Sequence, residues 1–309
     1  MSVRPADTSV AGPLISLVVA TYGRADVLER LIASLSQQTL QDFEVIIADQ
    51  NPDTRVDAML APLKATGRLG AHVRLAEPNL SRARNAGLAA ARGRIVGFPD
   101  DDCWYDPDTL ARVAACFSVE PQLTGIAARW AEAPPEPGDT APVISRAAMR
   151  RFRGGNVASI TLFLKVEAVR AAGGFDERIG VGRWYGAGEE TDLVLSLVGH
   201  DGLLRHAPKV VVHHAFVAER SDLPLPTLWR QTRTRARGTG ALYAKHRLPA
   251  WVIARGLVAP LLARPGPSLA AGLAMSIGRL EGLIGWKTAG RLVTRRERTA
   301  PERKPGPAP

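Results

Sequence analysis

This 309-residue chain has few cysteines and no long uninterrupted apolar run. Cys103 and Cys116 are too few for a disulfide framework and lack the neighbouring residues of a zinc site or a nucleophile triad, so we read both as structural. The most apolar stretch, 248–263, is interrupted by Arg255 and Pro260, so no transmembrane helix is expected. Because no secretory segment stands at the start, the expected compartment is the reducing cytoplasm.

Acidic residues are also scarce, but only in the last third of the chain. Residues 223–309 hold 16 Lys and Arg against 3 Asp and Glu, a net charge of +13, whereas the rest carries a net charge of −3. A basic segment with apolar side chains between its arginines favours an anionic membrane surface as partner. The alternatives are helices that pack on the catalytic domain and a dimer interface. Nucleic acid is not expected, since no binding module is recognisable. We therefore expect a cytoplasmic protein that is peripheral at the inner membrane face.

Short apolar segments alternate with amphipathic ones through the first hundred residues. Strand, helix and strand in succession predict a mostly parallel sheet with helices on both faces. The predicted strands are 14–20, 43–48, 71–76 and 94–98, followed by 156–164 and 209–213, and the predicted helices are 26–38, 54–65, 81–92, 167–172 and 189–199.

Polar residues follow the predicted strands, at the edge where α/β sheets bind ligands. Thr21 follows the first strand, Asp49 the second, and Asp100, Asp101 and Asp102 the fourth. Adjacent carboxylates repel one another unless a cation or solvent screens them, and hard divalent cations take such oxygen ligands. The triplet is therefore either a metal site or a solvated turn before the next helix.

Several motifs in order make the chain resemble glycosyltransferase family 2. They are the opening strand 16–24 (SLVVATYGR), the second strand ending at Asp49, the segment 83–87 (ARNAG) before an apolar strand and the aspartate triplet, then 173–177 (GGFDE) and 188–193 (GEETDL). The resemblance covers about residues 14–214 and implies a GT-A fold, a Rossmann-like, mostly parallel α/β sheet, and inverting glycosyl transfer from a nucleotide sugar.

The resemblance also implies which residues bind the donor and the metal. Asp49 would accept a hydrogen bond from the base, and Arg84 would face the diphosphate or base, since guanidinium suits phosphate. Mn²⁺ or Mg²⁺ would lie on the aspartate cluster, with one histidine after a later strand near the metal or diphosphate. The donor-binding candidates are Thr21, Tyr22, Arg24, Asp49, Arg84, Asp100 and Asp101, and the metal-ligand candidates are Asp100, Asp102, His213 and His214. Adjacent strand residues face opposite sides, so only one histidine is expected to serve.

The general base is expected at the start of the helix 189–199. Many members of the family have Glu-Asp there, whereas this chain has Glu189 and Glu190, which leaves Glu189, Glu190 and Asp192 as candidates, with Glu190 at the matching position. The alternative is an acidic helix start stabilised by the macrodipole. Trp184 and Tyr185, just before, would either stack on an acceptor sugar or pack in the protein.

The expected organisation is a tail (1–13), a GT-A domain (14–222), a basic helical extension (223–298) and a second tail (299–309). The donor half of the GT-A domain would be about 14–105 and the acceptor half about 106–222. The expected reaction uses a UDP-sugar and a saccharide or lipid-linked saccharide acceptor. A metal-dependent nucleotidyltransferase is the alternative enzyme, although no glycine-rich loop with a lysine follows the first strand. A non-catalytic nucleotide-binding scaffold is the third possibility.

Overall fold

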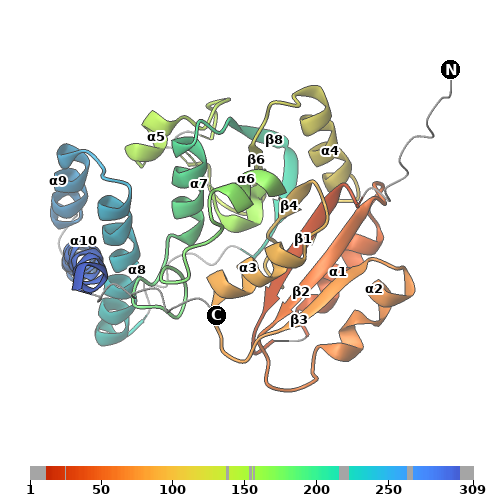
Figure 1. Cartoon of the computed structure of the whole chain (residues 1–309), viewed down its shortest axis with the longest axis horizontal. Helices are drawn as coiled ribbons and strands as arrows, with labels where there is room; N and C mark the ends of the chain where they lie inside the picture. Colours follow the sequence, from red (N-terminus) through yellow and green to blue (C-terminus); the bar gives the residue numbers. More distant parts are fainter. Residues whose placement is uncertain are drawn as a thin grey trace, which may run out of the picture. The chain divides into compact units, whose positions relative to one another are not determined.

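The chain forms two compact units in a computed structural model that describes residues 12–24, 26–136, 139–152, 155, 157–215, 223–262 and 267–299. One, the sheet unit, comprises 1–183 and 188–220; the other, the helical unit, comprises 184–187 and 221–309 (Figure 1). The predicted tails fall mainly outside the described residues.

An eight-stranded mixed sheet forms the centre of the sheet unit, in the order β3-β2-β1-β4-β7-β6-β8-β5. β3, β2, β1 and β4 are parallel neighbours, whereas β7 runs antiparallel to β4 and β6, and β5 antiparallel to β8. The strand bounds are β1 Ile15–Thr21, β2 Phe43–Asp49, β3 Leu69–Arg74, β4 Ile95–Gly97, β5 Trp104–Tyr105, β6 Gly125–Trp130, β7 Leu162–Lys165 and β8 Leu204–His213.

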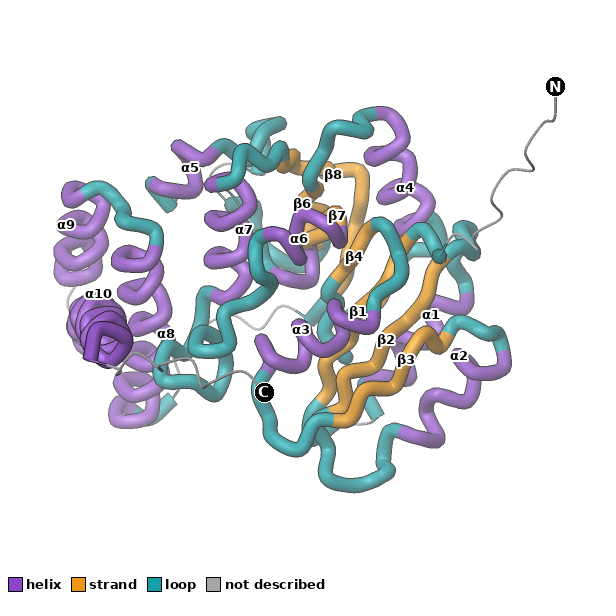
Figure 2. Tube along the Cα trace, viewed as in Figure 1, coloured by secondary structure: helices purple, strands orange, loops and turns teal. Residues whose placement is uncertain are grey.

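Helices cover both faces of this sheet (Figure 2). Alternate residues of β1 show why: Leu17 and Val19 pack in one core with α1 and α4, whereas Val18 packs in a second core with α3, α6 and α7. The bounds are α1 Leu28–Ser36, α2 Ala61–Ala65, α3 Leu80–Ala90, α4 Thr109–Val119, α5 Arg146–Arg150, α6 Val166–Ala171 and α7 Glu189–Gly199, with short 3₁₀ turns η1 Asp57–Leu60 and η2 Ser159–Thr161.

The predicted α/β class with a mostly parallel first half is confirmed, and the bounds of the first four strands differ from prediction by at most two residues. The predicted strand 156–164 was wrong in its first part, where a 3₁₀ turn precedes β7. β8 begins five residues earlier than predicted, and β5, β6 and α5 were not predicted. These elements are short or depend on pairing with distant strands.

The helical unit contains α8 Leu225–Lys245, α9 Ala250–Val258, η3 Ala259–Leu262 and α10 Pro267–Thr299. α8 and α10 approach closely through glycine: a Cβ added to Gly240 would lie 2.0 Å from the Arg279 carbonyl oxygen, and one added to Gly282 would lie 2.0 Å from that of Arg237. Only small residues permit such an approach. Among the helices described, none combines the length and apolarity that crossing a membrane requires.

Candidate active site

The carboxyl ends of β1 and β4 bring two predicted motifs together. Thr21 donates its hydroxyl to Asp101 at 2.8 Å, and the Arg24 guanidinium bridges Asp101 at 2.6 Å and Asp102 at 2.8 Å. Burial raises the pKa of Asp101 to about 6, although Thr21 and Arg24 oppose that shift. Arg24 therefore neutralises part of the aspartate cluster while remaining half-exposed at its edge.

Asp100, Asp102 and His214 form the group best suited to a divalent cation. One ligand atom from each lies within 4.8 Å of the others, and His214 Nε2 is 3.0 Å from Asp102 Oδ1. The hydrogen bond from His214, with help from Arg24, lowers the pKa of Asp102 to about 2, so this carboxylate stays ionised. Two carboxylates and an imidazole fit Mn²⁺ or a similar cation.

His213 lies away from this group, so His214 is the one of the two candidate histidines that lies beside the aspartates. Its ring stacks on Trp104 at 5.3 Å, and its nitrogens lie 2.8 Å from Glu132 and 3.1 Å from Asp106. The cause is the alternation of side chains where β8 ends, which sends consecutive residues to opposite sides.

Arg84 is buried beneath the cluster and connects it to the start of α7. Its guanidinium donates to Asp100 at 3.1 Å, to Ser159 at 2.7 Å and to Glu189 at 3.2 Å. Its side chain is only 3% exposed, so these protein groups already satisfy much of its hydrogen-bonding capacity. The geometry makes Arg84 a positioning residue, and the predicted contact with the diphosphate stays a prediction.

The three candidate bases at α7 have different surroundings. Glu189 is buried and paired with Arg84, and Asp192 is buried, whereas Glu190 is partly exposed. No ion pair of Glu190 is found within the described part of the chain. Desolvation, followed by the charge of Glu189, raises the pKa of Glu190. The negative charge of Asp100 adds to this rise, so Glu190 lies within electrostatic reach of the aspartate cluster.

A cavity of about 350 Å³ opens beside the cluster. Of the predicted donor-binding residues, Tyr22, Arg24, Asp100 and Asp101 line it, together with Ala20, Gln50, Pro78, Asn79, Leu80, Val181 and Gly182. Sequence reasoning missed Gln50 and Asn79, although Gln50 directly follows the predicted site residue Asp49. Gln50 accepts a hydrogen bond from the Asn79 backbone at 2.7 Å, which joins the ends of β2 and the start of α3.

Asp49 lies below this cavity and is fully buried. One of its carboxylate oxygens accepts hydrogen bonds from the backbone and side chain of Asn51, and the other lies 3.0 Å from His72 Nε2. Thr21 is likewise buried. A direct contact between Asp49 and a base stays a prediction. Gln50 and Tyr22 line the cavity, and of the two only Tyr22 is well exposed.

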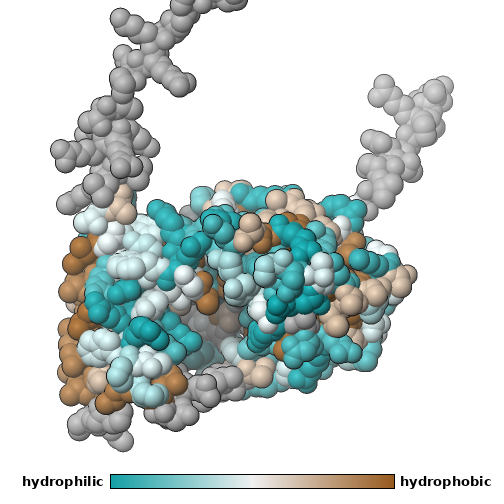
Figure 3. Space-filling view, turned by 90° about the horizontal axis from the view of Figure 1, so that it is seen from below, coloured by the Kyte–Doolittle hydropathy of each residue, from teal (hydrophilic) through white to brown (hydrophobic). Residues whose placement is uncertain are grey.

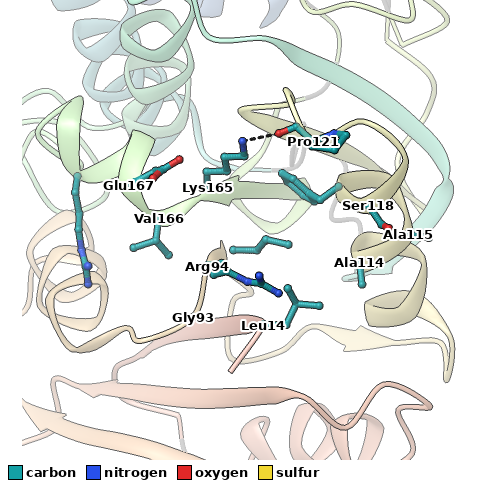
Figure 4. A pocket seen from close by; sticks show the side chains of 13 residues that line it. Leu14, Gly93, Arg94, Ala114, Ala115, Ser118, Pro121, Lys165, Val166 and Glu167 are labelled. Carbon is teal, nitrogen blue, oxygen red and sulfur yellow. Dashed lines mark hydrogen bonds between the residues drawn. The ribbon is translucent and has the colours of Figure 1, made fainter. Parts of the chain in front are cut away.

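A larger hollow, about 950 Å³, lies at the opposite, amino edge of the parallel strands (Figure 4). Leu14, Arg94, Lys165 and Arg170 are among its lining residues. Lys165 donates to the Pro121 carbonyl at 2.7 Å, and Arg170 to the carbonyls of Leu88 and Ala91. These cations therefore hold the protein together, and the carboxylates that could do chemistry lie at the other edge.

Trp184 and Tyr185, the acceptor candidates, pack within the helical unit. Their rings contact each other edge to face at 4.8 Å, Tyr185 lies 5.3 Å from Trp286, and the Arg237 guanidinium lies 4.7 Å from the Trp184 ring. The Gly186 backbone also donates to Thr234 of α8. This arrangement favours the packing alternative over sugar stacking.

The mixed sheet with helices on both faces is a GT-A-like fold. The model of the family described as Glycosyl transferase family 2 matches residues 16–156, which hold the opening strand and the aspartate cluster. Residues 16–156 therefore match a glycosyltransferase family 2 domain, which accounts for slightly less than half of the chain.

A curated relative agrees with the family match, and solved structures agree with the fold. The uncharacterized glycosyltransferase EpsJ of Bacillus subtilis is 38% identical over 102 residues, which span 33% of this chain and 29% of EpsJ. Among solved structures, the mannosyltransferase PcManGT from Pyrobaculum calidifontis, in complex with GDP-Man and Mn²⁺, aligns with a TM-score of 0.57 at 18% identity, covering 94% of this chain and 77% of that one. S. aureus TarS 1–349 in complex with UDP-GlcNAc aligns with a TM-score of 0.57 at 13% identity, covering 89% of this chain and 92% of that one.

Proposed function

We propose that this chain is an inverting, metal-dependent glycosyltransferase that moves a sugar from a nucleoside diphosphate sugar to a saccharide or lipid-linked saccharide. One observation carries the proposal: a carboxylate–imidazole group suited to a cation lies beside a cavity and is tied through Arg84 to the helix that presents Glu190. Peripheral attachment at the inner membrane face is part of the proposal, and it suits a lipid-linked acceptor.

The aspartate cluster would stabilise the leaving group. Asp100, Asp102 and His214 would hold Mn²⁺, which an imidazole-containing set accommodates better than Mg²⁺, and the cation would supply positive charge for the departing diphosphate. PcManGT was solved with Mn²⁺, which agrees with this choice. Arg84 contributes by fixing the position of Asp100. Arg24 holds Asp101 and Asp102 in place at the mouth of the cavity.

Glu190 would act as the general base toward the acceptor. A carboxylate that is partly exposed and has no ion pair among the described residues can accept the proton of an acceptor hydroxyl as that oxygen attacks the sugar carbon. The raised pKa of Glu190 strengthens it as a base, provided the pH keeps it ionised. Glu189 has a structural role instead, since its charge is paired with Arg84.

The test is a panel of labelled UDP- and GDP-sugars, including UDP-GlcNAc and GDP-Man, with the full chain in Mn²⁺, Mg²⁺ or EDTA. We propose UDP as the preferred nucleotide. Sugar transfer or slow donor hydrolysis that needs the cation supports the proposal. Absence of both across the whole panel contradicts it, and donor binding without turnover would indicate a scaffold.

A further inference from the structure

Large aliphatic side chains lie on the outer surface of α10. Leu269, Leu273, Ile277, Leu280 and Ile284 are each between 38% and 52% exposed. Their spacing of four, four, three and four residues places them within an arc of about 80° at the helical rotation of about 100° per residue. They therefore form one continuous apolar stripe along four turns of the helix.

The other side of α10 carries small residues. Ala274 is fully buried, and Cβ atoms added to Gly278 and Gly282 would lie 2.3 and 2.0 Å from carbonyl oxygens of α8. α10 thus buries its small side chains and exposes its large ones, the reverse of an ordinary amphipathic helix on a soluble core. The close backbone approach leaves no space for the large side chains on the inner side.

The segment before α10 adds to this surface. Trp251, Val258 and Leu262 are 51%, 50% and 79% exposed and recur at helical spacing along α9 and η3. We call these three residues together with the α10 stripe the outer apolar face. Figure 3 shows hydrophobic residues gathered along the left edge, the side on which Figure 1 places α9 and α10.

Positive charge accompanies the outer apolar face. The Arg255 guanidinium lies 5.4 Å from the Trp251 ring, and the exposed Lys287 continues the α10 stripe after Ile284. The acidic side chain of Glu281 is bonded to Arg233 and Arg237. The residues of this unit from 223 onward carry a net charge of +13.

We propose that the outer apolar face inserts into the headgroup–acyl boundary of an anionic lipid bilayer. An apolar patch of this size on a soluble protein marks an interaction site, and helices with apolar anchors and basic residues bind in the interfacial plane. Anionic headgroups match the charge of the unit, whereas a second copy of the chain would bring two strongly basic surfaces together. The inference rests on the membrane attachment in the proposed function and assigns it to named residues, but it does not depend on the reaction of the sheet unit.

Flotation of the full chain with phosphatidylcholine vesicles, with and without phosphatidylglycerol, tests the proposal. The wild type should float with the anionic vesicles, less so at high salt, and weakly with neutral ones. Leu273→Gln combined with Ile284→Gln keeps the charge and should lower the bound fraction at least tenfold. The matched control, Val119→Gln, changes an exposed aliphatic residue of the sheet unit and should bind as the wild type does.

A second pair of variants separates charge from apolar contact. Arg255→Gln with Lys287→Gln should weaken binding to anionic vesicles only, whereas Lys64→Gln with Arg94→Gln, exposed in the sheet unit, should have a smaller effect. Circular dichroism verifies the fold of each variant. The proposal is overturned if no vesicle binds the wild type, if Leu273→Gln with Ile284→Gln binds normally, or if light scattering shows a dimer that this variant dissociates while vesicles leave the wild type unbound.

Discussion

Arg84 and Glu189 form an ion pair of 3.2 Å between side chains that are 3% and 7% exposed. The same guanidinium donates to Asp100, so one buried cation supports both the cluster and the start of α7. Two motifs separated by about a hundred residues thus share one support. A displacement of Arg84 would disturb both at once.

Arg84→Met should therefore destabilise the protein and also lower its activity. Removing one partner of a buried pair typically costs about 3–5 kcal/mol, because the other charge is left uncompensated. Urea unfolding followed by circular dichroism measures the change in free energy of unfolding. Adding Glu189→Gln should restore part of the loss. Equal stability of Arg84→Met and the wild type, or a further loss in the double variant, would show that the pair has no such role.

Glu190→Gln should lower turnover by about 10² or more, the usual scale for a lost general base. The KM for the donor should change little, because Glu190 acts on the acceptor hydroxyl. Steady-state kinetics with the donor found in the panel provide the measurement. Glu167→Gln, an exposed glutamate of α6, is the matched control. If Glu190→Gln is benign while Asp192→Asn is inactive, the base is Asp192.

The pH profile of turnover should reflect the raised pKa of Glu190. The base works only when deprotonated, so activity is present above its pKa and is lost as the pH falls through it. Since burial and the charge of Glu189 raise this pKa, the acidic limb should lie at higher pH than the ordinary glutamate value of about 4.3. Glu189→Gln removes the neighbouring charge and should move the limb to lower pH. A limb that stays in place or moves upward contradicts this cause.

His214 and His213 offer a matched pair for the metal site. His214→Gln should weaken Mn²⁺ binding at least as much as the 10–100-fold typical of lost outer-shell partners, because it removes a group at the aspartate cluster. His213→Gln should leave Mn²⁺ affinity unchanged, since that ring lies with Trp104, Glu132 and Asp106. Electron paramagnetic resonance measures the concentration of free Mn²⁺ and therefore gives the binding affinity without any substrate. Equal effects of the two substitutions would refute the assignment.

The carboxyl edge of the sheet was predictable because local sequence determines it. Apolar β-branched runs define the strands, and Thr21, Asp49 and Asp100 follow directly after them. The helix 189–199 has the predicted bounds, because acidic residues favour its start and Gly188, with φ at 100°, precedes it.

Long-range packing explains what the sequence could not reveal. The positioning role of Arg84 depends on its hydrogen bonds to Ser159 and Glu189, which lie next to it only because of the sheet topology. Asp49 was predicted to accept a hydrogen bond from the base, yet its carboxylate is already bonded to Asn51 and lies against His72 of β3. The packing of Trp184 and Tyr185 depends on α8 and α10, whose helical periodicity does not reveal which residues lie nearby.

The most direct measurement is the identity of the nucleotide released from a labelled nucleotide sugar by the full chain with Mn²⁺ and an acceptor. The proposed function predicts a nucleoside diphosphate in the wild type, its loss in EDTA and in Asp102→Asn, and a reduction of about 10² in Glu190→Gln. Release of a nucleoside monophosphate together with sugar 1-phosphate, or undiminished nucleoside diphosphate release by Asp102→Asn at saturating Mn²⁺, would contradict it.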